Sequence, residues 1–153
     1  MSDDKYVKVL FRVYSDILEE ITVETMWTKV IDEVQGLYEL NNIPFYLPII
    51  ASGDIIFAEF DEDEKMLTYR ETREYSGNST IHVILMDDTA GLKNIGKTFE
   101  ELGCNWEGMG NKYFAIDVPV SVNYVLVKAR LEELKQQDII GYAESCLSEE
   151  HQY

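Results

Sequence analysis

The side chains best suited to binding a ligand are carboxylates, and four of them stand together in Asp61–Glu64. Clustered carboxylates suit hard divalent cations, which prefer oxygen ligands. A calcium loop, however, needs acids at alternate positions, then a glycine and a distal glutamate, and that spacing is absent. We interpret the run as a solvated hairpin tip, and docking onto a basic partner is the functional alternative.

A further carboxylate, Asp54, follows Gly53 in a short turn between two apolar segments. The pair has the composition of a cation-binding turn, since the carboxylate is a potential ligand. Structural roles are the stronger interpretation, because glycine supplies a positive φ and aspartate bonds the backbone of its own turn. We expect Asp54 to cap the turn.

Nucleophiles and bases are few. His82 lies in an apolar strand pattern without an identifiable Ser or Cys partner, so we expect a hydrogen-bonded histidine in or near the core. Cys104 has acidic neighbours, which raise the pKa of a thiol and make it inert. Two Cys and two His cannot assemble a closed zinc site at these spacings. The sequence therefore predicts no catalytic residues, no metal, no cofactor and no enzyme.

The charge of the chain is strongly negative: 29 acids stand against 13 bases, for a net charge of −16. The acids are spread along both halves, so the folded surface itself must be negative. Such a surface repels nucleic acid and anionic lipid, because phosphate contacts need Lys and Arg. It attracts cationic partners, although solubility alone also explains it.

The compartment is predicted from cysteines and from apolar runs. Cys104 and Cys146 are too few for a disulfide framework and fit a reducing environment. The N-terminal residues lack a basic segment followed by an apolar one, and the longest apolar run, Phe45–Ala51, is too short to span a bilayer. We expect a cytoplasmic protein without a membrane partner.

Residues 1–76 predict the elements that would position Asp54 and the acidic run. Five short segments of alternating or β-branched residues are separated by polar turns, a pattern typical of a small antiparallel barrel or sandwich. The expected strands are Tyr6–Tyr14, Ile21–Val30, Leu37–Leu40, Ile55–Phe60 and Met66–Glu74. The apolar stretch from Phe45 to Ile50 contains Pro48, which a central strand does not accept, so it should cover a barrel end or follow an edge.

Residues 77–153 change period and predict a second subdomain of β-α-β-α-β order, similar to ferredoxin-like halves, which shares the core of the first or has its own. Strands are expected at Thr80–Met86, Lys112–Val118 and Asp138–Cys146. One helix is expected after an Asp87–Thr89 cap and ends at Gly103; the other is capped by Ser121. The inward residues of the second helix should be Val122, Val125, Leu126 and Ala129.

We predict a connection over Cys104–Asn111 and a frayed tail over Ser148–Tyr153, with His151 in it. The fold class is α+β.

Three turns carry a resemblance to a known family. They are Asn42-Ile43-Pro44-Phe45, Gly53-Asp54, with an acid following at Glu59, and Ser76-Gly77-Asn78-Ser79-Thr80. Together they resemble a bacterial family of small proteins defined only as a domain of unknown function. These motifs are structural, so the resemblance implies kinship and brings no activity. Where histidine is common in that family, this chain has Asn78.

Compactness and distributed negative charge favour an immunity or inhibitor protein that occludes a cationic toxin domain, for example a nuclease. The alternative is a regulatory or ligand-binding module with a pocket between the two halves. The residues expected to contact a basic partner are Asp61, Glu62, Asp63, Glu64, Glu71, Glu74 and the aromatic anchor Trp106. The sequence leaves the oligomeric state open.

Overall fold

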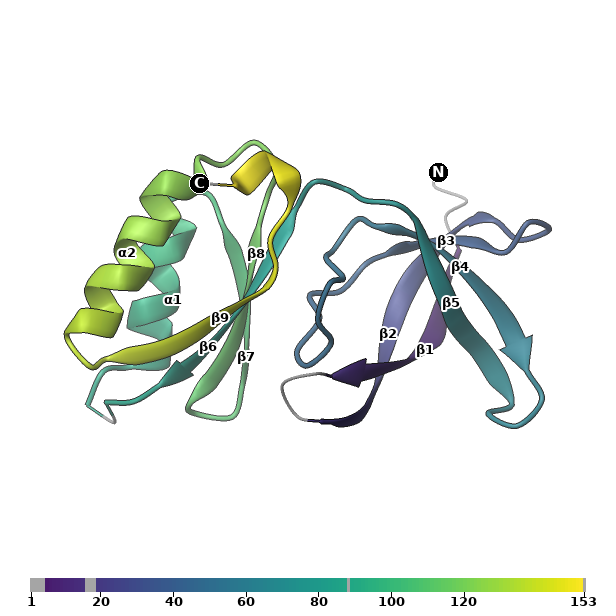
Figure 1. Cartoon of the computed structure of the whole chain (residues 1–153), viewed down its shortest axis with the longest axis horizontal. Coiled ribbons are helices and arrows are strands. Elements are labelled where there is room, and N and C mark those ends of the chain that lie inside the picture. Colours follow the sequence, from purple (N-terminus) through teal and green to yellow (C-terminus); the bar gives the residue numbers. More distant parts are fainter. Residues whose placement is uncertain (1–4, 16–18, 88, 153) are drawn as a thin grey trace. The chain divides into compact units, whose positions relative to one another are not determined.

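The computed structural model describes residues 5–15, 19–87 and 89–152. The chain divides into two compact units, Met1–Ser76 and Gly77–Tyr153, each with its own buried core (Figure 1). Strands predominate and two α-helices occur in the described part of the chain, so the predicted α+β class is confirmed.

The first unit consists of strands that wind around one apolar core (Figure 1). Its strands are β1 (Tyr6–Ser15), β2 (Glu20–Asp32), β3 (Leu37–Leu40), β4 (Ile55–Asp61) and β5 (Met66–Glu74). Successive strands pair antiparallel, and a parallel contact between Leu10 and Thr68 joins β1 to β5, which closes the ring. The alternation predicted for β1 is present at Val9 and Phe11, which are fully buried, and is interrupted at Leu10, which is buried as well.

Two inward carboxylates organise the long connection between β3 and β4. Both oxygens of Glu24 accept backbone N–H groups of the connection, from Phe45 at 2.9 Å and from Tyr46 at 3.1 Å. Asp54 is buried and accepts the N–H of Ala51 at 3.1 Å and that of Ser76 at 2.9 Å. The apolar stretch therefore forms no strand; its Leu47 and Ile50 close the core instead.

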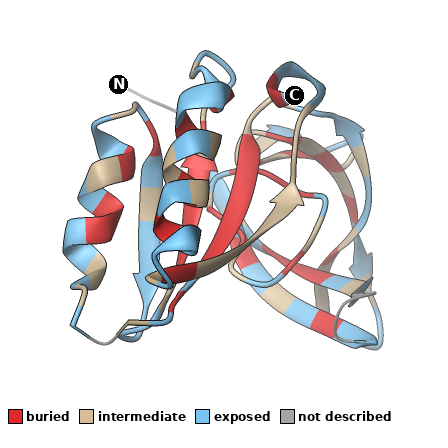
Figure 2. Cartoon of the chain, turned by 60° about the vertical axis from the view of Figure 1, so that its left-hand side comes forward, coloured by how far each residue is buried: buried red, intermediate tan, exposed pale blue. Residues whose placement is uncertain are grey.

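The second unit is a four-stranded sheet with both helices on one face (Figures 1 and 2). Its chain order is β6 (Ser79–Leu85), α1 (Leu92–Glu100), β7 (Asn105–Met109), β8 (Tyr113–Val118), α2 (Tyr124–Gln136), β9 (Ile140–Cys146) and a short 3-10 helix, η1 (Glu149–His151). The spatial order is β7-β8-β6-β9, with every pair antiparallel. Side chains from the strands and both helices form its core.

Strand β7 corrects the prediction of a connection over Cys104–Asn111. It pairs with β8 from Asn105 opposite Asp117 to Met109 opposite Tyr113. This edge strand is mostly exposed, and its helix-facing positions are Trp106 and Gly108, which has no side chain. Its sequence therefore lacks the apolar alternation of a half-buried strand. Adding it changes the predicted β-α-β-α-β order to β-α-β-β-α-β.

The predicted helix starts are also wrong. The first helix begins after Gly91 without a side-chain cap, and Asp87 instead accepts hydrogen bonds from Thr89. The second begins after Asn123, whose side chain accepts the N–H of Val125 at 3.0 Å.

This later start rotates the predicted inward face of α2. The buried residues are Tyr124, Val127, Leu131 and Leu134. Of the residues predicted to face inward, Val125 and Leu126 are 63% and 55% exposed, Ala129 is exposed, and Val122 lies before the helix, partly buried against the core. Asn123 is a strong helix N-cap, and its position sets which residues follow at i+3 and i+4.

The C-terminal segment is ordered by a buried histidine, which corrects the prediction of a frayed tail over its described residues. His151 is 2% exposed; its Nδ1 lies 2.7 Å from Ser79 Oγ and its Nε2 lies 3.1 Å from the carbonyl oxygen of Pro119. Ser79 Oγ also accepts the N–H of Ser148 at 2.9 Å. Ser79 in β6 and His151 thus attach η1 to the sheet.

Candidate functional site

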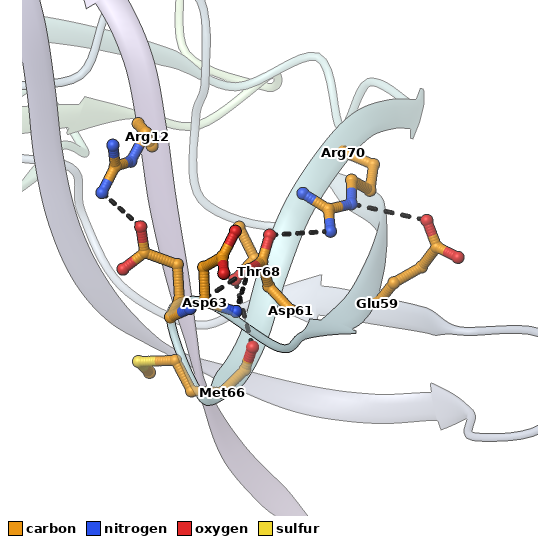
Figure 3. A network of polar contacts seen from close by, with 8 residues as sticks. Arg12, Glu59, Asp61, Asp63, Met66, Thr68 and Arg70 are labelled. Carbon is orange, nitrogen blue, oxygen red and sulfur yellow. Dashed lines mark hydrogen bonds and ion pairs between the residues drawn. The ribbon is translucent and has the colours of Figure 1, made fainter.

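The predicted acidic site forms the tip of the β4–β5 hairpin (Figure 3). Asp61 Oδ1 accepts the backbone N–H groups of Asp63 at 2.9 Å and Glu64 at 3.1 Å, while its carbonyl accepts that of Lys65. Lys65 completes the turn at a φ of 58°. These bonds hold the tip in one conformation, because an aspartate can satisfy the backbone of its own turn.

Arginines neutralise part of this acidic tip (Figure 3). Arg12 in β1 pairs with Glu64, and Arg70 in β5 bridges Asp61 at 3.1 Å and Glu59 at 3.4 Å. The Glu64 N–H and the Arg70 guanidinium hold the pKa of Asp61 below its ordinary value. Asp61 and Glu64 therefore shape the tip more than they present charge.

The remaining acids of the tip point to solvent. Glu62 and Asp63 are exposed, and among the described residues neither side chain forms an ion pair. They are the two charges of the run Asp61–Glu64 that a partner can meet without first displacing an arginine.

Glu71 and Glu74 lie further along β5 and are exposed. Glu71 pairs with Arg73 at 2.5 Å, and the Arg73 guanidinium also stacks over the Phe57 ring at 4.6 Å. Glu74 ends the strand opposite Ile55 and has no ion pair within the described residues. The acidic surface thus extends along one strand from the hairpin tip, with arginines interspersed.

Trp106, the predicted aromatic anchor, belongs to the second unit and packs inside it. Its ring meets Phe114 edge-on at 5.8 Å and covers Gly96 of α1, and its indole N–H donates to Glu100 at 2.7 Å. It is only partly exposed and contributes to the core beneath α1. The six predicted acids all lie in the first unit.

Sequence reasoning missed a hollow in the first unit. It has a volume of about 340 Å³ and is lined by Tyr6, Trp27, Asn41 and Asn42. Trp27 and Tyr6 are 46% and 47% exposed. The Trp27 backbone N–H donates to Asn42 Oδ1 at 2.5 Å, and Asn41 N–H donates to the Trp27 carbonyl at 3.0 Å. The available signal was an aromatic residue at an outward position of each of two paired strands.

The candidate chemical residues occupy structural positions. His82 is 9% exposed, and its Nδ1 lies 2.7 Å from Ser145 Oγ, as expected for a hydrogen-bonded histidine near the core. Burial, reinforced by the charge of Asp117, raises the pKa of Cys104 to about 12, so burial rather than the neighbouring glutamates is the main cause. Within residues 5–15, 19–87 and 89–152, no group of three His, Cys, Asp or Glu could hold a metal ion.

Comparison with known proteins places this fold among uncharacterised proteins. The family model described as a domain of unknown function (DUF4265) matches residues 24–142, so the chain belongs to that family. No curated protein matches. The crystal structure of a hypothetical protein from Neisseria gonorrhoeae is similar, with a TM-score of 0.81 and 24% identity over 94% of this chain and 96% of that chain. That similarity establishes the fold alone.

None of the helices in the described part of the chain has the length and apolar character needed to cross a bilayer.

Proposed function

We propose that this protein is a cytoplasmic immunity or inhibitor protein that neutralises a cationic toxin domain, such as a nuclease, by covering its surface. It performs no chemistry in this role, and its negative charge excludes nucleic acid as a partner. The observation that supports the proposal is the fixed β4–β5 hairpin tip, which presents Glu62 and Asp63 to solvent.

A fixed tip favours binding because less conformational entropy is lost when a partner docks. Asp61 already satisfies the turn backbone, so a cationic partner meets charges at set positions. Glu74 and the net charge of −16 add long-range attraction, which speeds the encounter. The arginines that pair with neighbouring acids limit self-repulsion within the tip.

We further assign the second unit to the ferredoxin-like class. The β-α-β-β-α-β order and two helices on one face of an antiparallel sheet support the assignment. This class hosts many unrelated functions, so the assignment by itself implies no role for the second unit. The proposed binding role rests on the surface of the first unit.

The test is co-purification with the protein encoded by the neighbouring reading frame, which the proposal expects to carry a basic toxin domain. Glu62→Lys should weaken the complex roughly three- to tenfold, mainly through slower association, because exposed interface charges act on the encounter. Glu101→Lys is the matched control: it makes the same charge change at an exposed site of the second unit and should change the affinity less than about twofold. Absence of any complex with a basic neighbour, or equal effects of both substitutions, would contradict the proposal.

A further inference from the structure

The outer face of the β1–β2 pair differs from the rest of the first unit in composition. Residues 1–76 contain 17 acids and 7 bases, yet three of those bases, Lys8, Arg12 and Lys29, lie at outward positions of these two strands. In register, Tyr6 stands opposite Lys29 and Lys8 opposite Trp27, so aromatic and basic side chains alternate in both directions. Arg12 pairs with Glu64 and Lys29 stands opposite Glu39 of β3, so Lys8, beside the Trp27 ring, is the base that gives this aromatic surface a local positive charge.

The hollow lies beside these alternating aromatic and basic side chains, because Tyr6 and Trp27 line it. Its lining residues are Tyr6 and Trp27, each about half exposed, together with Asn41 and Asn42. Lys8 Nζ sits 5.1 Å from the centre of the Trp27 ring. A lysine already covers this ring, so a cationic ligand would meet like charge, whereas an anionic group would gain the ammonium as a partner.

The lining residues also favour a flat ligand. Exposed aromatic faces stack on planar rings such as nucleic-acid bases. Asn42 Oδ1 is held by the Trp27 N–H, which leaves its amide N–H₂ as the donor side, and the Asn41 side chain is exposed at the rim. The Asn42 N–H₂ can therefore donate to an acceptor on the edge of a base, and Asn41 can offer both an acceptor oxygen and an N–H₂ donor. The volume of about 340 Å³ is at the lower end of ligand sites, which suits one small molecule.

We propose that the hollow formed by Tyr6, Trp27, Asn41 and Asn42 binds a planar aromatic ring that carries an anionic group, the chemistry of a nucleoside monophosphate. The base stacks between Trp27 and Tyr6, and Lys8 turns from the Trp27 ring to the phosphate. The acidic remainder of the surface repels a polyanionic strand, so the occupant is the free nucleotide. This inference is independent of the acidic hairpin and survives if that proposal fails.

The experiment titrates the full chain with adenosine monophosphate and follows the Trp27 indole resonance by NMR, assigned from a Trp27→Phe spectrum. Binding should be in the range of about 0.1–5 mM, as expected for a shallow site. Adenosine and inorganic phosphate should each bind at least about threefold more weakly than the nucleotide, because each lacks one of the two contacts. Lys8→Gln should remove the advantage of the nucleotide over adenosine and leave adenosine binding unchanged.

The matched variants are two tyrosines of the same strand face. Tyr6→Ala should weaken nucleotide binding at least about fivefold by removing one stacking surface. Tyr14→Ala removes a tyrosine that is 56% exposed, opposite Ile21 and outside the hollow, and should leave binding unchanged. No Trp27 shift at about 10 mM nucleotide, or equal effects of both variants, overturns the proposal. An oligoadenylate strand that binds more than about tenfold tighter than the mononucleotide overturns the free-nucleotide assignment.

Discussion

Some carboxylates of the first unit hold the backbone, and others face solvent. Glu24 and Asp54 point inward and accept N–H groups of the long β3–β4 connection, and Asp54 also accepts the N–H of Ser76 after β5. Asp61 does the same within the hairpin tip. A buried backbone N–H must find an acceptor, so these acids substitute for the sheet hydrogen bonds that an irregular segment lacks. Part of the acidic composition is therefore structural.

Asp54→Asn should destabilise the protein by about 1–3 kcal/mol at neutral pH. The two Asp54 oxygens accept N–H groups from Ala51 and Ser76, and an amide offers only one acceptor, so one donor is left facing another. Urea denaturation of both proteins measures the difference. Asp63→Asn, at an exposed position, is the control and should change stability by less than about 0.5 kcal/mol.

The same variant tests the pH dependence of Asp54. Burial raises the pKa of Asp54 above its ordinary value of 3.8 despite its hydrogen bonds. The free energy of unfolding therefore includes a contribution from the protonated Asp54 carboxyl. This contribution is fully present below the unfolded-state pKa of 3.8 and is lost as the pH rises through the higher folded-state pKa. The destabilisation by Asp54→Asn should therefore be larger below the folded-state pKa of Asp54 than at pH about 7, because only the wild-type protein gains this contribution. A difference that grows with pH would contradict this sign.

At the residue scale, sequence patterns located the acidic tip but not its charge distribution. Gly53 adopts a φ of 84° and Asp54 bonds its own turn, as the turn chemistry predicted. The pairing of Arg12 with Glu64 joins residues that are distant in sequence, so no local pattern could reveal it. The hollow was missed for the same reason, because it joins a strand pair to a separate turn.

At the element scale, helix α1 packs closely on the sheet of the second unit at Gly96. A Cβ built there would lie 2.2 Å from the Trp106 ring. Alanine normally stabilises a helix by about 1 kcal/mol relative to glycine. Here Gly96→Ala should instead destabilise by about 1–3 kcal/mol through overpacking. Thermal and urea denaturation measure the effect, with Lys97→Ala as the exposed control on the same helix.

A second substitution separates overpacking from any other cause. Trp106→Leu removes the ring that the added methyl would strike, so the penalty of Gly96→Ala should shrink in that background. Strictly additive effects of the two substitutions would show that the Gly96–Trp106 contact does not limit α1 packing.

Strand patterns predicted the elements of this chain better than helix patterns did. Strands β3 and β5 have the predicted bounds, because alternation and flanking turns act locally. The inward face of α2 failed because the prediction started the helix at Ser121 rather than Asn123. Strand β7 was missed because an exposed edge strand carries little alternation. His151 was missed because its partner, Ser79, is far away in sequence.

At the scale of the whole molecule, negative charge opposes compactness in both units. The net charge of −16 divides into −10 for residues 1–76 and −6 for residues 77–153. Described ion pairs such as Lys5–Glu33 and Arg130–Glu133 are exposed and contribute little to stability. Each unit keeps its fold through its own apolar core and its inward hydrogen bonds. Because like charges repel one another within the free protein, a cationic partner that binds the folded state would stabilise it.

Salt should therefore stabilise the free protein. Raising NaCl from about 20 to 300 mM shortens the range over which surface charges interact, which screens net repulsion more than it weakens the few exposed ion pairs. The midpoint of urea denaturation should rise, and Glu62→Lys, which reduces the net charge by two, should respond less. If the midpoint fell with salt, attractive pairs such as Arg70 with Asp61 would outweigh repulsion. The acidic surface would then be internally compensated, and its long-range attraction for a cationic partner would be lost.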